Sequence, residues 1–188
     1  PEVRVIADPH PDWTAGLRNS FILFENLTIA SLVDFKEGGD VWNGTKGALF
    51  HFGTHADTER RGTTATYGNF AGVPVSGPGA GKEVLFNQSW FTGLGSGFGP
   101  VASQFIEDGS YVKLREVAVS YSLPTSITGR LGMSGIDLKV AGRNLKTWTD
   151  YTGIDPETNL AGNTNLRGID YFNNPQTRSF VFTVNLNR

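Results

Sequence analysis

The sequence predicts an all-β fold, and two observations support this prediction. Apolar and polar residues alternate along several long runs, a period-two pattern that is typical of strands with one apolar and one polar side. The chain also combines 24 glycines and 12% aromatic residues with only 18% charged residues. This mixture favours twisted strands and wide loops over helices.

Five runs are predicted as strands, and each is longer than an ordinary strand. The first two are separated only by Glu25 and Asn26, the spacing of a tight β-hairpin in which Asn26 tolerates a positive φ. Pro124 ends the third run because proline cannot donate a ladder hydrogen bond. The runs span about 12–24, 27–37, 109–123, 135–147 and 178–187.

Two long segments rich in glycine, at about 38–108 and 150–177, separate these runs. Irregular segments of this length are unusual in a compact domain and are usually functional loops. Within the first loop, the partly helical spacing of apolar residues indicates a short helix over 40–52, capped by Asp40.

The polar side of such strands can face bulk water in a soluble sandwich or a water-filled lumen in a barrel wall. Strand length favours the barrel, because a tilted strand needs about 9 to 11 residues to cross a bilayer, whereas globular strands average about 5 to 6. We therefore predict C-terminal antiparallel strands of a large transmembrane β-barrel with long extracellular loops. Five strands cannot close a barrel of transporter width, so the barrel is expected to be incomplete in this chain.

Composition argues against several other classes of protein. The net charge is −2, and no Lys/Arg cluster lies beside aromatic residues, so no nucleic-acid partner is expected. The absence of cysteine excludes disulfides, thiolate metal sites and a cysteine nucleophile. His51 and His55 are four residues apart, but Gly53 between them weakens a shared helical face, and no metal site is expected. The glycine-rich run 76–82 departs from the phosphate-loop pattern, and no cofactor is expected.

The candidate substrate-binding residues lie in or beside the predicted loops. Flat aromatic faces bury the apolar C–H surface of sugar rings, while neighbouring carboxylates and amides bind hydroxyl groups. Asp155 and Glu157 offer paired carboxylates, but Asp155-Pro156 is more simply explained as a turn, and no catalytic residue is expected. The candidates are Trp42, Trp90, Phe91, Tyr151 and Asp150.

The segment 144–157, Asn-Leu-Lys-Thr-Trp-Thr-Asp-Tyr-Thr-Gly-Ile-Asp-Pro-Glu, closely resembles a hallmark near the C-terminus of SusC/RagA-type TonB-linked outer-membrane proteins. Segments 8–13 with 34–40, 109–124 and 174–182 resemble the same family in the same order. The resemblance implies a barrel in the bacterial outer membrane that imports a glycan or oligopeptide. It further implies a SusD-like surface lipoprotein as lid and energy from the TonB complex.

Two features depart from the family pattern. The family usually ends on an aromatic residue, whereas this chain ends Asn187-Arg188, and the plug domain that contacts TonB is expected to be absent from these residues. Two alternatives therefore stay open. A soluble secreted all-β carbohydrate-binding module would fold as a monomer in plain buffer, and a small secreted hydrolase would lose activity on substitution of Asp155 or Glu157.

Overall fold

The computed structural model describes residues 4–60, 85–162 and 166–188, and the chain forms two compact units. The sheet unit consists of Pro11–Gly38, Gly109–Asp150 and Pro175–Arg188. The loop unit consists of Pro1–His10, Gly39–Asp108 and Tyr151–Asn174. The glycine-rich run 76–82 lies outside the described residues.

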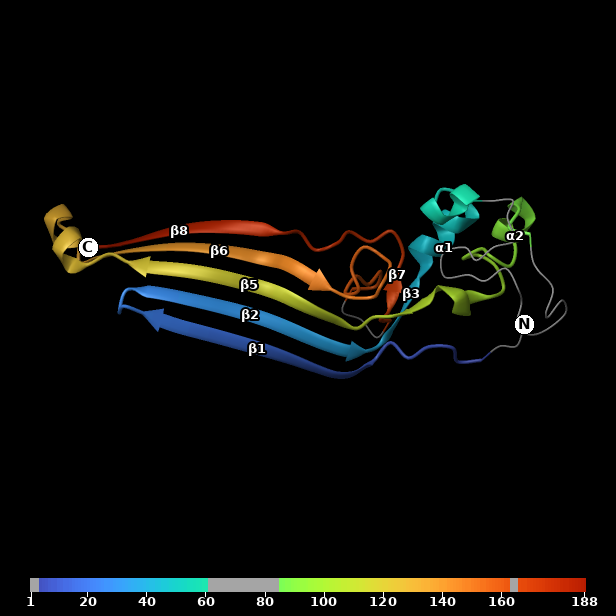
Figure 1. Ribbon diagram of the computed structural model, residues 1–188, viewed down its shortest axis with the longest axis horizontal. Coiled ribbons are helices and arrows are strands. Elements are labelled where there is room, and N and C mark those ends of the chain that lie inside the picture. The colour runs from blue at the N-terminus through green and yellow to red at the C-terminus, as the bar shows by residue number, and fades with distance from the viewer. Residues whose placement is uncertain (1–3, 61–84, 163–165) are drawn as a thin grey trace. The chain divides into compact units, whose positions relative to one another are not determined.

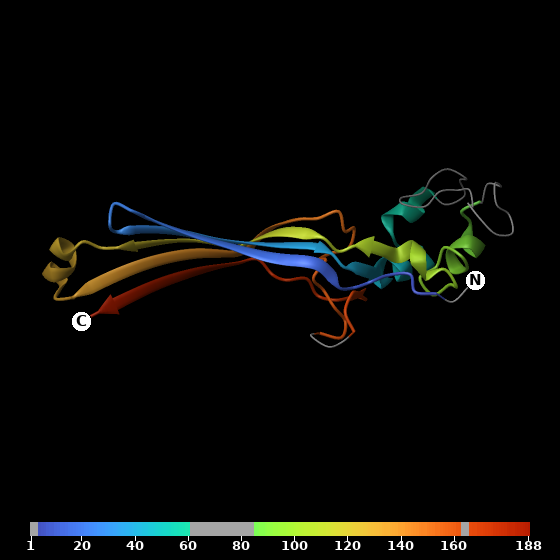
Figure 2. The ribbon, with the colours of Figure 1, turned by 90° about the horizontal axis from the view of Figure 1, so that it is seen from below.

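The sheet unit is a single antiparallel sheet in the order β1-β2-β5-β6-β8 (Figure 1). Figure 2 shows the twist of this sheet, whose strands fan apart in that view. The prediction of an antiparallel β fold is confirmed, and the sheet of this chain is open. Its strands are β1 (Pro11–Leu23), β2 (Leu27–Gly38), β5 (Tyr111–Ser122), β6 (Gly135–Trp148) and β8 (Ser179–Asn187).

Cross-strand register sorts the side chains into rows that alternate between the two faces of the sheet. Residues paired across antiparallel strands share a face, and the next residue along each strand points to the other face. One row is apolar in every strand: Phe21, Ile29, Val119, Val140 and Phe182. The neighbouring row on the opposite face is small or weakly apolar: Ser20, Ala30, Ala118, Ala141 and Val181.

A β-bulge at Arg115 interrupts the pairing of β5 with both neighbours. Leu32 pairs with Glu116 and Val33 with Leu114, so Arg115 is the additional residue on β5. The Arg115 Nε lies 2.6 Å from Asp34 Oδ2, which fixes the bulge to β2. Beyond the bulge, Leu114 again lies opposite an apolar residue, because the extra residue restores the alternation.

The β1–β2 hairpin has a three-residue connection, because Leu23 pairs with Leu27. Phe24 and Glu25 adopt positive φ angles of 51° and 66°, the left-handed geometry that suits tight hairpins. The prediction that Asn26 would take the positive φ was wrong, since the left-handed positions fall one and two residues earlier. Between β5 and β6 the chain forms two short helical turns, α3 (Thr125–Thr128) and η3 (Gly129–Leu131).

The loop unit has its own small sheet, in the order β4-β3-β7, with β3 parallel to β7. The segment 39–108, expected to be largely irregular, therefore contains regular elements within its described part. These elements are β3 (Asp40–Asn43), α1 (Gly44–His51), η1 (Ala56–Arg60), α2 (Gln88–Thr92), η2 (Ala102–Phe105) and β4 (Ile106–Asp108). The third strand of the small sheet, β7 (Ile169–Asp170), lies within the second loop.

Aromatic residues fill the core of the loop unit. The buried rings of Phe50, Phe86, Phe91 and Phe105 form one cluster, and Trp42 and Trp90 pack against it. The predicted short helix is α1, but its cap is Asn43, whose side chain accepts a 2.9 Å hydrogen bond from Lys46 N. Asp40 does not cap it, because 40–43 are extended in β3. Within the part of the chain that the structure describes, none of the helices is long and apolar enough to cross a membrane.

Substitution of Gly168 by alanine is expected to destabilise the loop unit strongly. Gly168 has φ of +71°, and an added Cβ would lie 2.5 Å from the Asp40 carbonyl oxygen. We expect a loss of about 2 kcal/mol or more in the free energy of unfolding, measured by chemical denaturation followed by tryptophan fluorescence. Gly162→Ala is the matched control, since φ there is +63° but nothing lies within 4 Å of the added Cβ. Equal losses in both variants would show that the close contact is unimportant.

Candidate functional site

The sheet unit exposes a continuous apolar face. Phe182 and Val184 on β8 are 76% and 61% exposed, and exposed apolar residues from the other strands extend the same surface. Soluble monomers rarely expose contiguous apolar patches of more than a few hundred Å². This face therefore needs an apolar neighbour. Its other exposed members include Trp13, Leu17, Phe21, Val119, Tyr121, Leu138, Val140, Trp148, Phe180 and Leu186.

The opposite face of the sheet unit carries ion pairs and hydrogen bonds. Arg115 bonds Asp34, and Arg143 Nε lies 3.1 Å from Glu116 Oε2. The Ser122 hydroxyl donates a 2.6 Å hydrogen bond to Asp137. Charges arranged in this way are solvated on an aqueous surface, so the two faces of the sheet differ fundamentally in chemistry.

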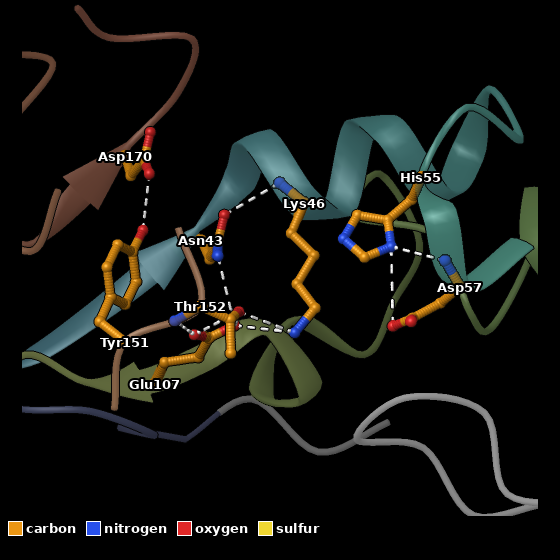
Figure 3. Close-up of polar contacts among 8 residues, drawn as sticks. All are labelled: Asn43, Lys46, His55, Asp57, Glu107, Tyr151, Thr152 and Asp170. Atoms are coloured by element: carbon orange, nitrogen blue, oxygen red, sulfur yellow. Dashed lines mark hydrogen bonds and ion pairs between the residues drawn. The ribbon is translucent and has the colours of Figure 1, made fainter. Parts of the chain in front are cut away.

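A buried ion pair in the loop unit joins three distant parts of the sequence (Figure 3). Lys46 Nζ lies 3.0 Å from Glu107 Oε1, and the two side chains are only 6% and 10% exposed. Thr152 donates its backbone N–H to Glu107 Oε2 at 2.8 Å, and its hydroxyl also contacts Lys46 Nζ at 3.0 Å. Asn43 Nδ2 donates to Glu107 Oε1 at 3.2 Å. The carboxylate of Glu107 thus holds β3, α1 and the second loop together.

The environment of Glu107 stabilises its charged form. Burial alone would raise the pKa of this carboxyl. The hydrogen bonds from Thr152 and Lys46 and the charge of Lys46 lower the pKa by more than burial raises it, so the pKa of Glu107 lies below its usual value. The ionised state is therefore the one compatible with the folded loop unit.

A second buried group of polar contacts centres on Asp170. The Tyr151 hydroxyl donates a 2.6 Å hydrogen bond to Asp170 Oδ2 (Figure 3). The Thr45 hydroxyl donates to Asp170 Oδ1 at 2.8 Å. Burial, the hydrogen bond to Asp170 and the charge of Asp170 raise the pKa of Tyr151 well above its usual value. The phenol stays neutral and acts as a structural donor.

The two histidines of α1 and the following turn have separate partners. His51 Nδ1 lies 2.9 Å from the Ser96 hydroxyl, whereas His55 Nδ1 accepts a hydrogen bond from Asp57 N at 3.1 Å. Burial lowers the pKa of His55, which favours its neutral form. Among the residues that the structure describes, no group of three His, Asp or Glu side chains is placed to hold a metal ion.

The structure brings together only some of the residues that the sequence suggested for substrate binding. Trp90 and Phe91 lie with Trp42 in the aromatic core of the loop unit, whereas Tyr151 bonds Asp170. Phe91 and Tyr151 are 4% and 5% exposed, so their rings pack against protein and have no face available for a ligand. Asp150 is exposed and belongs to the sheet unit.

Sequence reasoning missed Lys46, Glu107, Thr152 and Asp170. The side-chain hydrogen bonds that join these residues to their partners span between 19 and 125 residues of sequence, so no local pattern predicts them. The one available signal was the position of Tyr151 and Thr152 inside the 144–157 hallmark segment, which indicated importance but not a role.

Replacing Glu107 by glutamine is expected to destabilise the loop unit by about 3 to 5 kcal/mol, because the buried Lys46 ammonium loses its carboxylate partner. Chemical denaturation across a pH series provides the measurement. Since the folded-state pKa of Glu107 lies below its unfolded value of about 4.5, the stabilisation by Glu107 is present above pH 4.5 and is lost as the pH falls through the folded pKa. The variant should lack this acid-dependent loss.

Glu116→Gln is the matched control for this substitution. It removes the same charge from the pair with Arg143, whose side chain is 56% exposed, and should change stability by no more than about 1 kcal/mol. A Glu107→Gln loss as small as that of the control would contradict a structural role for the buried pair.

No family model matches the chain. It is 29% identical over 97% of its length to TonB-dependent receptor P3 of Formosa agariphila and 27% identical over 88% to TonB-dependent receptor P26 of the same organism. The chain spans 17% and 15% of the length of these two relatives.

Solved structures share the fold of the chain. Chains of the RagAB peptide importer in the "open-open" and "closed-closed" states cover 98% and 97% of it, with TM-scores of 0.58 and 0.60 and 18% and 19% sequence identity. The matched region is 18% of each of those chains. The resemblance that the hallmark segments carry, to SusC/RagA-type TonB-dependent receptors of the bacterial outer membrane, is thereby confirmed, because the chain is similar in sequence to two TonB-dependent receptors and shares the fold of the RagAB chains.

Proposed function

We propose that the sheet unit is part of the wall of a transmembrane β-barrel, with its apolar face against lipid. The observation that carries the proposal is the apolar row that crosses all five strands, whose members on β1, β5, β6 and β8 are exposed. Such a row needs an apolar neighbour along its whole length. Strand length supports it, because these strands have 9 to 14 residues and a tilted membrane strand needs about 9 to 11. Lipid provides that neighbour, and the remaining strands of the barrel come from the rest of a longer protein.

In this arrangement the polar face lines a water-filled lumen. The ion pairs of Arg115 with Asp34 and of Arg143 with Glu116 keep their charges in an aqueous space. Residues 38–108 and 150–177 form the extracellular loops, and the chain is the C-terminal part of the barrel domain. The plug domain and the TonB contact belong to a part of the protein outside this chain.

The whole protein imports a nutrient across the outer membrane, using energy from TonB and a SusD-like lipoprotein as lid. The names of the relatives support this proposal, because P3 and P26 are TonB-dependent receptors and RagAB is a peptide importer. The substrate is a glycan or an oligopeptide. The activity is binding and gating, with no covalent catalysis. Of the aromatic loop candidates, Trp42 and Trp90 are half-buried rather than buried, so they are the two that we propose to contact substrate.

Cysteine labelling tests the barrel, because the chain contains no cysteine. In the full-length receptor, single cysteines at Val140 and Phe182 sample the apolar row, and cysteines at the paired Lys139 and Thr183 sample the adjacent row on the other face. We expect bimane attached at 140 and 182 to be quenched by brominated lipid, and bimane at 139 and 183 by aqueous iodide. Iodide quenching at all four positions would place both faces in water and favour a soluble carbohydrate-binding module.

Gene deletion tests the import function. A strain without the receptor should lose growth on one nutrient class, either polysaccharides or a protein digest, and recover it when the full-length gene is restored. The nutrient lost identifies the substrate as glycan or peptide. Unchanged growth on every nutrient, together with release of the protein into the medium, would contradict the import proposal.

A further inference from the structure

An exposed aromatic residue of the loop unit is held in a strained backbone conformation. Phe172 has φ of +54°, in the left-handed region that residues with a Cβ rarely adopt, and the residue is 55% exposed. Phe24 is also left-handed and exposed, but the tight β1–β2 hairpin requires that geometry. Phe172 lies in no hairpin. Glycine or asparagine would be the residue with the least strain there, so local stability does not account for phenylalanine.

The surroundings of Phe172 maintain the strain from three directions. Before it, β7 is paired in parallel with β3. The backbone N–H of Phe172 donates a 2.6 Å hydrogen bond to the Thr45 hydroxyl, which in turn donates to the buried carboxylate of Asp170. After it, the Asn173 side chain accepts a hydrogen bond from Tyr171 N at 2.8 Å. A strained conformation persists only where neighbouring contacts determine it in this way, and such positions concentrate at functional sites.

The result is an aromatic ring directed to solvent on a rigid base. The Tyr171 ring lies edge-on to Phe172 with centroids 5.0 Å apart, and it is also parallel to the Trp42 ring with an interplanar angle of 6°. Because Trp42 packs on the buried aromatic core, the exposed ring is connected to that core through Tyr171. The amides of Asn173 and Asn174 follow directly in the sequence.

We propose that Phe172 is a substrate-contacting residue that stacks on the apolar face of a sugar ring, with the adjacent amides bonding its hydroxyl groups. A rigid exposed aromatic face beside amide groups matches the mixed apolar and hydroxyl surface of a saccharide. The inference rests on the proposed import function and deepens it, because it selects glycan over peptide and names the contact residue. In this proposal the strained backbone conformation of Phe172 is retained because it positions the phenyl ring for contact with the sugar.

The test compares stability and binding in the same variant of the full-length receptor. Phe172→Gly relieves the strain and removes the ring, so the unfolding temperature should stay the same or rise by about 1 to 2 °C, while sugar binding falls at least about fivefold. The probe is a mixture of short oligosaccharides from partial hydrolysis of starch, xylan and mannan, with binding followed by saturation-transfer NMR of the ring protons. Phe172→Tyr, which retains the ring, should preserve the signal.

Phe52→Gly is the matched control, because Phe52 is 66% exposed but has an ordinary helical φ of −82°. It should lower the unfolding temperature slightly and leave the sugar signal intact. An unchanged sugar signal in Phe172→Gly overturns the proposal, and so does a lower unfolding temperature, which would make the ring a packing residue. Binding of a tryptic casein digest that depends on Phe172, without sugar binding, overturns the assignment to glycan. These readouts do not require growth, so they separate this inference from failure of the import proposal.

Discussion

The organisation of the sheet unit depends on one constraint, the cross-strand register that places most of the large apolar residues of the five strands on the same face. A shift of one residue in any strand would exchange its two faces and place charges among apolar rows. The bulge at Arg115 is part of this constraint. Leu114, which precedes the bulge, and Val117 and Val119, which follow it, all lie on the apolar face, because the extra residue changes which positions share a face. The pair of Arg115 with Asp34 therefore stabilises the register as well as the local contact.

The loop unit is organised differently, around buried polar contacts as well as an aromatic core. Glu107 receives hydrogen bonds from Lys46, Asn43 and Thr152, and Asp170 receives them from Thr45 and Tyr151. Each carboxylate joins segments that are far apart in the sequence. A buried charge is costly unless it is paired, so these contacts form together or not at all. The hallmark residues Tyr151 and Thr152 thus have a structural explanation, since Tyr151 donates a hydrogen bond to Asp170 and Thr152 donates one to Glu107.

Aromatic residues of the loop unit divide into two groups whose roles differ. Phe91 and Tyr151 are buried and stabilise the unit, whereas Phe172 is exposed and costs conformational energy. Their residue type is almost the same, so the distinction depends on burial and backbone geometry. Phe172 contacts Tyr171, and Tyr171 stacks on Trp42, which packs against the buried aromatic core. The packing of the loop unit is therefore linked to the proposed contact of Phe172 with substrate.

The sequence by itself determined that the chain is antiparallel β with one apolar and one polar side to each long strand. Alternation is a local property, and it survives in the sequence whatever the strands pair with. The hallmark segments likewise carried the resemblance to TonB-dependent receptors, because each segment is contiguous in the sequence. Only the tertiary structure decided that Phe91 and Tyr151 are buried, that Asn43 caps α1, and that Lys46 meets Glu107 across 61 residues. The burial of Phe91 and Tyr151 and the pairing of Lys46 with Glu107 arise from contacts between distant segments, which no periodicity in the sequence encodes. The Asn43 cap is a local contact with Lys46 N, but its place depends on where β3, paired with β4 and β7, ends. The positive φ at Phe172 likewise has no signal in the sequence.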